Sequence, residues 1–532
     1  MTGCRSFSAT CQDCERRILI IRLSATLPRP SPAALEQTKA EIEAFLDSCP
    51  GAVLFEEGAE LLDIADSNCR ISVEFGKLLL ETWDSRRSIL RRVEEIAFRD
   101  KGRLGLFVRR RGGRETGVIE LRAPAGPTPV PRAEARSRLR LEISAYFKKN
   151  FPEWRLERVS NRSDREHSFS AWYTRGLARQ GRKAWAFLAL GDSESPAAAD
   201  SALAYGLNWF GWLRDVETGS VVSSLKLFLP PAAIPLNAAR AAYLNPDAGK
   251  IEIFPWPAAS ASERVLPGEF GNIETHLALR RDAGPWIERC QDLLLSWFEK
   301  SLGSLDVVPD SAANALSFRL FGLEVARMEG QIAPALLWGV EGNRKVFREE
   351  ERGEFLQFMQ RVLESRRSGG PAGSEYFCLQ PERWLESMLI RDLSKLDPEL
   401  MRSPVYPQVP AFSGIDRGVV DILGISKAGR LAVIELKLHE DVTLPLQGLD
   451  YWMRVKQLND RGQFHASGYF PGVVISPLPP VLYLVAPAFR FHPANERIVR
   501  YFDPSLEIIH AGINQQWREG IKVLFRRNVR RE

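Results

Sequence analysis

The chain has 532 residues, of which 45% are hydrophobic and 26% charged; it is too long for one hydrophobic core and predicts three or four units. Its 72 basic and 67 acidic residues leave a net charge of +5, which excludes the global basic field of a histone-like protein. Any anionic partner must then be bound by local patches. Three arginine clusters are candidates, and each alone is interpreted as a solvated surface. They are Arg109, Arg110, Arg111 and Arg114; the run from Arg132 to Arg140; and Arg526, Arg527, Arg530 and Arg531.

The amino-terminal residues 1–30 do not have the order of a signal peptide, and no apolar run approaches the roughly 20 residues that cross a bilayer. We therefore expect a cytoplasmic protein with no membrane partner. Seven scattered cysteines favour reduced thiols over a disulfide framework. Cys4, Cys11 and Cys14 include one C-x-x-C, but no second ligand pair follows at a zinc-finger spacing. A poorly ordered leader over residues 1–30 is the preferred interpretation.

A β-rich domain with an amino-terminal helix is predicted over residues 31–122. Ser31 followed by Pro32 is typical of a capped helix start, and the helix is expected to reach Leu46. Short alternating runs punctuated by glycine then predict hairpins. These runs are 53–55, 71–75, 77–83, 103–109 and 116–121. The proline-rich residues 123–131 can continue neither a helix nor a strand, so they predict a linker.

Residues 132–257 are expected to form an α/β domain in the order αβββαβ. The carboxy-terminal domain is predicted to have the same order, which suggests an internal duplication. An unrelated α/β domain with surface arginines is an equally favoured alternative. The expected elements are a helix over 133–151, strands near Leu156 and Ala171, the apolar run 184–190, a helix over 197–214 and a strand over 224–229.

The central strand of this domain, residues 184–190, carries no acidic residue or lysine where a metal site would need them. If the duplication is real, this copy is therefore expected to be a degenerate nuclease-like domain without metal chemistry. Its remaining candidates would at best be a nucleic-acid-contacting face. They are Tyr173, Arg175, Arg179 and Arg182.

Residues 258–367 are expected to be an α+β connector. They combine predicted helices over 284–301 and 348–366 with a hairpin of 315–325 and 335–340. The following residues 368–374 are rich in glycine and serine and mark a flexible joint. A new domain is predicted over 375–532.

The most informative segment runs from Gly414 to Lys437 and reads as two apolar strands, 419–425 and 431–438. Gly429 is placed for the left-handed residue of a three-residue hairpin loop between them. If Ser426 pairs with Arg430, counting back along both strands places Asp421 opposite Glu435. Two carboxylates then lie on one face of the hairpin.

Along the second strand side chains alternate, so Val433, Glu435 and Lys437 share a face. Burying such ions costs several kcal/mol each unless they are paired or ligate a metal. This cost indicates a functional site. The alternative is a buried structural ion pair.

An acid 14 residues before E-x-K, with a hairpin loop between them, resembles the PD-(D/E)XK nuclease superfamily and, in detail, its NucS-like endonuclease branch. The resemblance covers about residues 375–490. It implies a restriction-endonuclease-like αβββαβ fold, which a strand over 481–486 would complete. The first strand departs from the family pattern only in having no proline before Asp421.

Two further elements agree with this resemblance. Glu386 lies on a predicted helix from Pro381, at the position of the family's helical acid. Gln447 and Tyr451 lie four residues apart on one face of a helix that follows Pro445, and they match the Q-x-x-x-Y element of the superfamily. The resemblance thus implies catalytic roles for Glu386, Asp421, Glu435 and Lys437, with Gln447 and Tyr451 steadying the site or contacting the scissile strand. For Tyr451, core packing is an equal alternative.

The ligand types predict the metal. Carboxylates of Asp421 and Glu435 with the Leu436 carbonyl suit a hard octahedral cation, so Mg²⁺ or Mn²⁺ is expected rather than zinc. Glu386 would hold a second metal site or a bound water, and Lys437 would orient the attacking water. The six histidines have no metal-binding spacing, which agrees.

Three nearby residues have less specific interpretations. His439 is expected to be a surface histidine at a strand end. Arg417 and Lys456 are candidates for nucleic-acid phosphate contacts, which position a strand without reading its sequence. Exposed cations without a partner would have the same pattern.

The function predicted from the sequence is hydrolysis of DNA phosphodiester bonds in repair or defence, with single-stranded or branched DNA as the favoured substrate. The alternative is a non-catalytic nucleic-acid-binding or protein-interaction scaffold with a nuclease fold. Two-strand cleavage would favour a homodimer.

Overall fold

The computed structural model of the chain is mixed α/β with several sheets, and two compact units divide it at Pro129/Val130. None of the helices in the described part of the chain has the length and apolar character that spanning a membrane requires. The predictions for the leader 1–30 with its three cysteines, and for the linker beyond Ala123, lie outside the described residues. The structure describes residues 31–49, 52–56, 59–64, 69–74, 77–83, 88–100, 102–110, 115–123, 132–164, 166–257, 264–267, 275–277, 279, 284–298, 305–310, 315–330, 334–340, 344–367, 369–371, 374–413 and 417–529.

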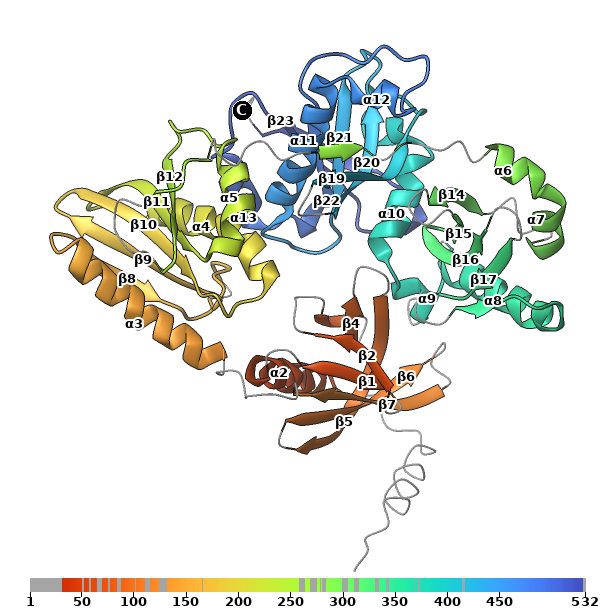
Figure 1. Cartoon of the computed structure of the whole chain (residues 1–532), viewed down its shortest axis with the longest axis horizontal. Helices are drawn as coiled ribbons and strands as arrows, with labels where there is room; N and C mark the ends of the chain where they lie inside the picture. Colours follow the sequence, from red (N-terminus) through yellow and green to blue (C-terminus); the bar gives the residue numbers. More distant parts are fainter. Residues whose placement is uncertain are drawn as a thin grey trace, which may run out of the picture. The chain divides into compact units, whose positions relative to one another are not determined.

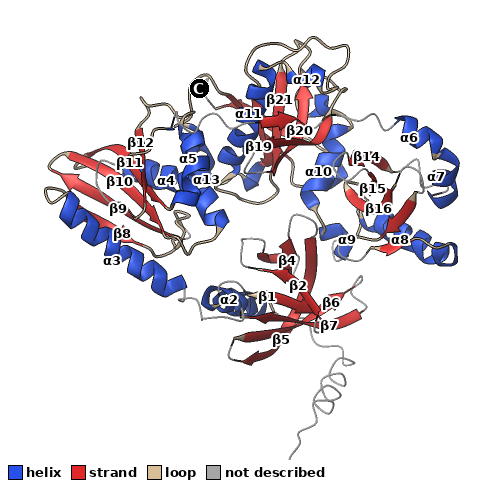
Figure 2. Ribbon diagram, in the orientation of Figure 1, coloured by secondary structure: helices blue, strands red, loops and turns tan. Residues whose placement is uncertain are grey.

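The first unit is a helix packed on a seven-stranded antiparallel sheet of order β2-β1-β7-β6-β5-β4-β3 (Figure 2). Helix α2 begins where the sequence predicts, with the Ser31 hydroxyl accepting from Ala34 N at 3.2 Å. Its Leu35, Ile42 and Phe45 pack into the core of the sheet. The elements are α2 Pro32–Ser48, β1 Val53–Glu56, β2 Ala59–Asp63, β3 Cys69–Glu74, β4 Lys77–Trp83, β5 Ser88–Asp100, β6 Arg103–Arg110 and β7 Glu115–Arg122.

Strand β5 is absent from the sequence-based prediction although it is 13 residues long. Its charged residues hide the alternation on which the prediction depends. In the structure these charges are paired across the sheet, Arg91 with Glu56 at 2.9 Å and Glu94 with Arg109 at 2.7 Å. Partners on β1 and β6 thus stabilise a segment that its own sequence does not mark as a strand.

The second unit contains two α/β segments with the same topology, named here the first repeat (residues 132–255) and the second repeat (residues 381–513). In each, two antiparallel pairings are followed by two parallel ones. Helices occupy equivalent places between the strands. The duplicated strand order predicted from the sequence is therefore confirmed.

The first repeat has sheet order β12-β11-β10-β9-β8, with α3 on one face and α4 on the other (Figure 1). The strand expected near Ala171 begins two residues later, at Tyr173. Helix α5 and strand β12 were not predicted. The elements are α3 Arg132–Asn150, β8 Arg155–Ser160, β9 Tyr173–Gln180, β10 Lys183–Leu190, α4 Pro196–Val216, β11 Val221–Leu229, α5 Ile234–Ala241 and β12 Lys250–Pro255.

The second repeat lies in a seven-stranded sheet of order β13-β19-β20-β21-β22-β23-β24, which gains an edge strand at each end. Helix α10 covers one face through Trp384 and Leu385, and α11 covers the other through Leu446 and Leu449. The elements are β13 Thr275–Leu277, α10 Pro381–Ile390, β19 Tyr406–Ser413, β20 Arg417–Ile425, β21 Leu431–Leu436, α11 Leu444–Asp460, α12 Gln463–Ala466, β22 Val481–Pro487, α13 Pro493–Val499, β23 Glu507–Ile513 and β24 Val523–Asn528.

The sequence between the two repeats forms a third sheet, of order β14-β15-β16-β17-β18, with its own core. Two predictions here are wrong in detail. The strand expected over 315–325 is a tight hairpin, because Phe321 and Gly322 both have positive φ. The helix expected over 284–301 is two helices that meet at Cys290. The elements are α6 Gly284–Arg289, α7 Gln291–Phe298, β14 Asp306–Asp310, β15 Ala315–Leu320, β16 Leu323–Glu329, β17 Ala335–Trp338, β18 Lys345–Val346, α8 Arg352–Ser365 and α9 Glu375–Cys378.

Candidate active site

The hairpin β20–β21 has the register that the sequence predicts. Ile422 pairs with Ile434 and Ile425 with Leu431, and the turn closes with Ser426 N donating to Arg430 O at 2.8 Å. The next pair along this ladder is Asp421 and Glu435. Asp421 Oδ2 accepts a hydrogen bond from Leu436 N at 3.1 Å, which fixes its carboxylate beside the start of the E-x-K segment.

Both carboxylates face helix α11. Side chains alternate along a strand, and the odd-numbered Leu423 and Val433 belong to the core that contains α11 residues. Asp421 and Glu435 share that parity, whereas Ile422 and Ile434 pack on the α10 side. The predicted separation of the two faces is therefore confirmed for the described side chains.

Glu435 is almost completely buried, with 2% of its surface exposed. Burial, followed by the negative charge of Asp421, raises the pKa of Glu435 well above its usual range. The Lys437 Nζ lies 3.5 Å from Glu435 Oε1 and offsets part of this charge. Strand β21 ends at Leu436, one residue earlier than Lys437, yet Lys437 N still donates to Val485 O at 2.9 Å and keeps the strand direction.

Glu382 is a second acid beside Lys437 that the sequence-based prediction missed. Burial is the largest single influence and lowers the pKa of Lys437, but the surrounding acids, with Glu382 ahead of Glu435, together outweigh it and raise that pKa above its usual value. Glu382 Oε1 also accepts from Leu438 N at 3.3 Å. Its position one helical turn before Glu386 is the sequence signal that could have identified it.

Glu386 lies on α10, on the other side of the sheet from α11, and is 4% exposed. Its Oε2 accepts from Arg383 Nη1 at 2.7 Å and from Gln408 Nε2 at 2.6 Å. Burial, with the charge of Asp421 in addition, outweighs Arg383 and raises the pKa of Glu386 to about 7. The charge of Asp421 thus affects Glu386, but the hydrogen bonds of Glu386 come from Arg383 of its own helix and Gln408 of β19.

Gln447 and Tyr451 lie one turn apart on α11, the helix that the carboxylates face. Burial and then the charges of Glu435 and Asp421 raise the pKa of the Tyr451 phenol above its usual value, which indicates that the phenol lies close to both acids. Buried Gln447 Oε1 and buried Glu435 Oε2 accept no hydrogen bond from any described residue. Buried oxygens without donors are costly unless something outside the chain satisfies them.

Oxygens of this kind fit a divalent cation. Carboxylate and amide oxygens are the donors that Mg²⁺ and Mn²⁺ prefer, and a cation between Asp421 and Glu435 would remove the cost of facing carboxylates. No cluster of three or more His, Cys, Asp or Glu side chains placed to hold an ion occurs among the described residues. The structure thus brings together Asp421 and Glu435, with the Leu436 backbone beside them, but does not add Glu386 to that pair.

The other candidate residues are less close to the carboxylates or outside the description. Lys456 Nζ pairs with Asp460 Oδ2 at 2.6 Å on the surface of α11, and the side chain of Arg417 is not among those described. His439 follows Lys437 and Leu438 and is half-buried rather than a surface residue. Each arginine cluster has a described member in an ion pair: Arg109 with Glu94, Arg136 with Glu194 and Arg526 with Asp397.

In the first repeat, a nucleic-acid-contacting face that includes Tyr173 and Arg175 is wrong. Tyr173 is 1% exposed and Arg175 6% exposed, because both point into the core between β9 and α4. Arg175 stacks its guanidinium on Phe169 at 4.7 Å and donates to Arg162 O at 2.7 Å. Arg179 pairs with Glu217 at 2.6 Å, and only Arg182 is fully on the surface.

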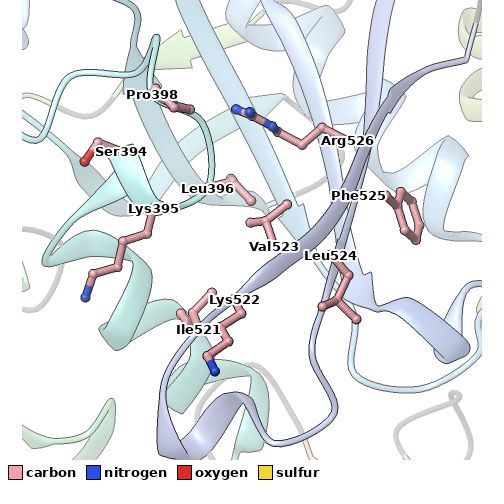
Figure 3. A pocket seen from close by; sticks show the side chains of 10 residues that line it. All are labelled: Ser394, Lys395, Leu396, Pro398, Ile521, Lys522, Val523, Leu524, Phe525 and Arg526. Atoms are coloured by element: carbon pink, nitrogen blue, oxygen red, sulfur yellow. The ribbon is translucent and has the colours of Figure 1, made fainter.

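A surface pocket of about 490 Å³ lies elsewhere in the second unit, between the segment that follows α10 and strand β24 (Figure 3). It contains none of the predicted site residues. The pocket is lined by Ser394, Lys395, Leu396, Pro398, Ile521, Lys522, Val523, Leu524, Phe525 and Arg526. Its wall has no carboxylate, so the facing acids of β20 and β21 remain the better candidate for metal chemistry.

Comparison of the sequence with protein-family models and with curated proteins finds no match in either.

Proposed function

We propose that the second repeat is a Mg²⁺- or Mn²⁺-dependent deoxyribonuclease of the PD-(D/E)XK, restriction-endonuclease-like type, acting on DNA in repair or defence. The observation that carries this proposal is the hairpin register that sets Asp421 opposite Glu435, with Lys437 at 3.5 Å from Glu435. The orphaned Glu435 Oε2 supports it, since a buried carboxylate oxygen without a donor needs a cation or a proton.

Each residue has a role that follows from its position. Asp421 and Glu435 would hold the cation, and Asp421 is kept in place by the Leu436 amide. When bound, the cation supplies Lewis-acid chemistry: it lowers the pKa of a water and offsets charge on the phosphate. Lys437, which stays protonated beside Glu382 and Glu435, can donate to the attacking water or to a phosphate oxygen.

The reaction balances as a hydrolysis. Water gives its oxygen to phosphorus and loses a proton, one phosphorus–oxygen ester bond breaks, and the leaving oxygen takes up a proton. No oxidant or second substrate is needed. Gln447 Oε1 and the Tyr451 hydroxyl lie on the α11 side of this reaction, where they can hold the water or the strand.

A panel of labelled substrates tests the proposal. Purified full-length protein is incubated with single-stranded, duplex and forked DNA, and with RNA of the same sequences, in Mg²⁺ or Mn²⁺. Cleavage of single-stranded or forked DNA is expected from the wild type and from Glu440→Ala, a variant of an exposed nearby acid, but not from Asp421→Ala. Absence of cleavage on every DNA with both metals would contradict the proposal.

A non-catalytic scaffold is the second candidate, and one observation favours it: among the described residues no three acidic or metal-binding side chains gather around one point. A metal titration separates the two. For the enzyme, Mn²⁺ should raise Tm in the wild type and leave Tm of Glu435→Ala unchanged. For the scaffold, both proteins should ignore the metal.

A further inference from the structure

The two repeats can be aligned residue by residue from their strand registers. Leu225 pairs with Ile251 in the first repeat, and Leu482 pairs with Ile508 in the second. The same number of residues separates the members of each pair. The connection between these strands therefore has the same length in both repeats, and when Leu225 is matched with Leu482, Arg240 of α5 is equivalent to Arg497 of α13.

The glycines of the main helices give a second, independent alignment. A Cβ on Gly206 of α4 would lie 2.8 Å from Leu227, and a Cβ on Gly448 of α11 would lie 2.7 Å from Leu484. Leu227 and Leu484 are equivalent by the strand registers. Helices α4 and α11 thus cross their sheets at the same place, and Asn208 of α4 is equivalent to Asp450 of α11.

The contacts between the repeats are reciprocal under this alignment. Arg240 of the first repeat donates to Asp450 of the second at 2.7 and 2.8 Å. Arg497 of the second donates to Asn208 of the first at 2.7 Å. Each repeat therefore presents the same helix pair to the other, which is the property of an isologous interface between two copies of one fold.

Aromatic side chains repeat this exchange. Two residues after Asn208, the ring of Phe210 packs on Tyr501, with 5.2 Å between the ring centroids. Two residues after Asp450, the ring of Trp452 packs on Tyr243, with 5.7 Å between the centroids. In the alignment of the two repeats, Tyr243 corresponds to the residue immediately before Tyr501. Backbone segments also meet there, since Leu244 forms an antiparallel bridge with Phe502. The apolar core runs without a break from one repeat into the other.

Only one of the two repeats keeps the acids. In the first repeat, Arg175 pairs with Leu188 across the corresponding hairpin. Arg175 stands at the position of Asp421, and Leu188 at the position of Glu435. Leu190 follows two residues later, at the position of Lys437. Both leucines are 1% exposed and pack in the core.

We infer that the two repeats form an internal pseudo-dimer, and that the protein therefore works as a monomer with one active centre that severs one nucleic-acid strand per binding event. The inference rests on the proposed function for its chemistry and on the reciprocal contacts for its geometry. The helix surface that a second copy would use is already buried inside the chain. Since the strands of a duplex need one attack each, a single centre leaves the second strand intact.

A two-colour cleavage assay tests this inference. A forked DNA with a different dye on each strand is mixed with excess protein and Mn²⁺ in a single turnover. We expect singly cut forks to accumulate first, with doubly cut forks appearing only after a lag, and Leu188→Val should keep this pattern. Simultaneous cutting of both strands would overturn the inference and leave the proposed function intact. If the wild type cuts neither strand, the proposed function is wrong, and the inference that one strand is cut per binding event is wrong as well.

A charge exchange tests the geometry without catalysis. Arg240→Asp and Asp450→Arg should each lower Tm by several degrees, and the double variant should recover much of the loss, because the pair is re-formed with its charges exchanged. Light scattering of the wild type should give the mass of one chain, 59.9 kDa. A double variant no better than the worse single variant would overturn the pseudo-dimer, and a wild type at twice that mass would overturn its action as a monomer.

Discussion

The two repeats have the same strand order and the same helix placement, but opposite chemistry at three equivalent positions. Asp421, Glu435 and Lys437 of the second repeat correspond to Arg175, Leu188 and Leu190 of the first. The surrounding apolar residues are buried alike in both. This scaffold therefore does not require an acid or a lysine at these positions, because the first repeat folds around Leu188 and Leu190 in place of Glu435 and Lys437.

Glu435 therefore gives the second repeat a stability cost that Leu188, at the equivalent position, does not give the first. Glu435 is buried beside another acid, which raises its pKa, whereas Leu188 adds to the core. A cost of this kind is typical of a functional site, where stability is exchanged for activity. The predictions below test the difference between the repeats.

The largest expected effect is on hydrolysis. Asp421→Ala and Glu435→Ala should each reduce the single-turnover cleavage rate by about 10³-fold or more, because each removes a carboxylate that would hold the cation. Leu188→Val, at the equivalent place in the first repeat, should leave the rate within a factor of two or so of wild type. Comparable losses in both repeats would mean that the first repeat also takes part in the chemistry.

Substitutions at the equivalent positions Leu188 and Glu435 should change the free energy of unfolding in opposite directions. Leu188→Ala is expected to lower the free energy of unfolding by about 2–5 kcal/mol through loss of core packing. Glu435→Leu, which introduces the residue of the first repeat, should raise that free energy by about 1–3 kcal/mol in EDTA while abolishing cleavage. Urea denaturation measures both. A Glu435→Leu variant less stable than wild type would show that the acid is structural.

The pH dependence of stability provides a further test through Glu386. Its folded pKa of about 7 exceeds its ordinary value of 4.5, so the folded state favours the protonated form. This contribution is present in full below pH 4.5 and is lost as pH rises through 7. Relative to Glu386→Gln, wild type in EDTA should thus lose up to about 3 kcal/mol between about pH 5 and pH 8. Parallel stability curves would contradict the burial of an ionisable Glu386.

The smallest effect concerns what the repeats share. Gly206→Ala and Gly448→Ala should each cost about 1–3 kcal/mol, because the new Cβ would overlap a leucine on the adjacent strand in both repeats. Gly353→Ala in α8, where a Cβ meets nothing within 4 Å, serves as the control and should not lower Tm. If only one of the two glycines is sensitive, the repeats do not have the same helix packing.

The sequence predicts the β20–β21 hairpin well because its signals are local. The turn around Gly429 and the alternation along 431–437 determine the register of Asp421 and Glu435 without any distant contact. The duplicated order αβββαβ was predicted for the same reason. Helix α11 was placed by Pro445, which lies in its first turn.

Contacts between distant segments could not be predicted. Glu382, Gln408 and Arg383 reach the site only after α10 packs on the sheet, and no spacing in the sequence relates Gln408 to Glu386. Arg175 was taken for a surface residue because arginine is seldom buried; here aromatic rings and two backbone carbonyls surround it. Strand β5 was missed because its charges are paired with residues of other strands.

The account rests on a cation between Asp421 and Glu435, and the most direct test is to locate it. Crystals of the full chain soaked in Mn²⁺ should give one strong anomalous peak within about 2.5 Å of both carboxylates, and no peak beside Leu188 in the first repeat. Crystals of Glu435→Gln should lose or weaken that peak. Wild-type crystals that bind Mn²⁺ elsewhere, or in which the Lys437 ammonium alone occupies the space between the acids, would contradict the account.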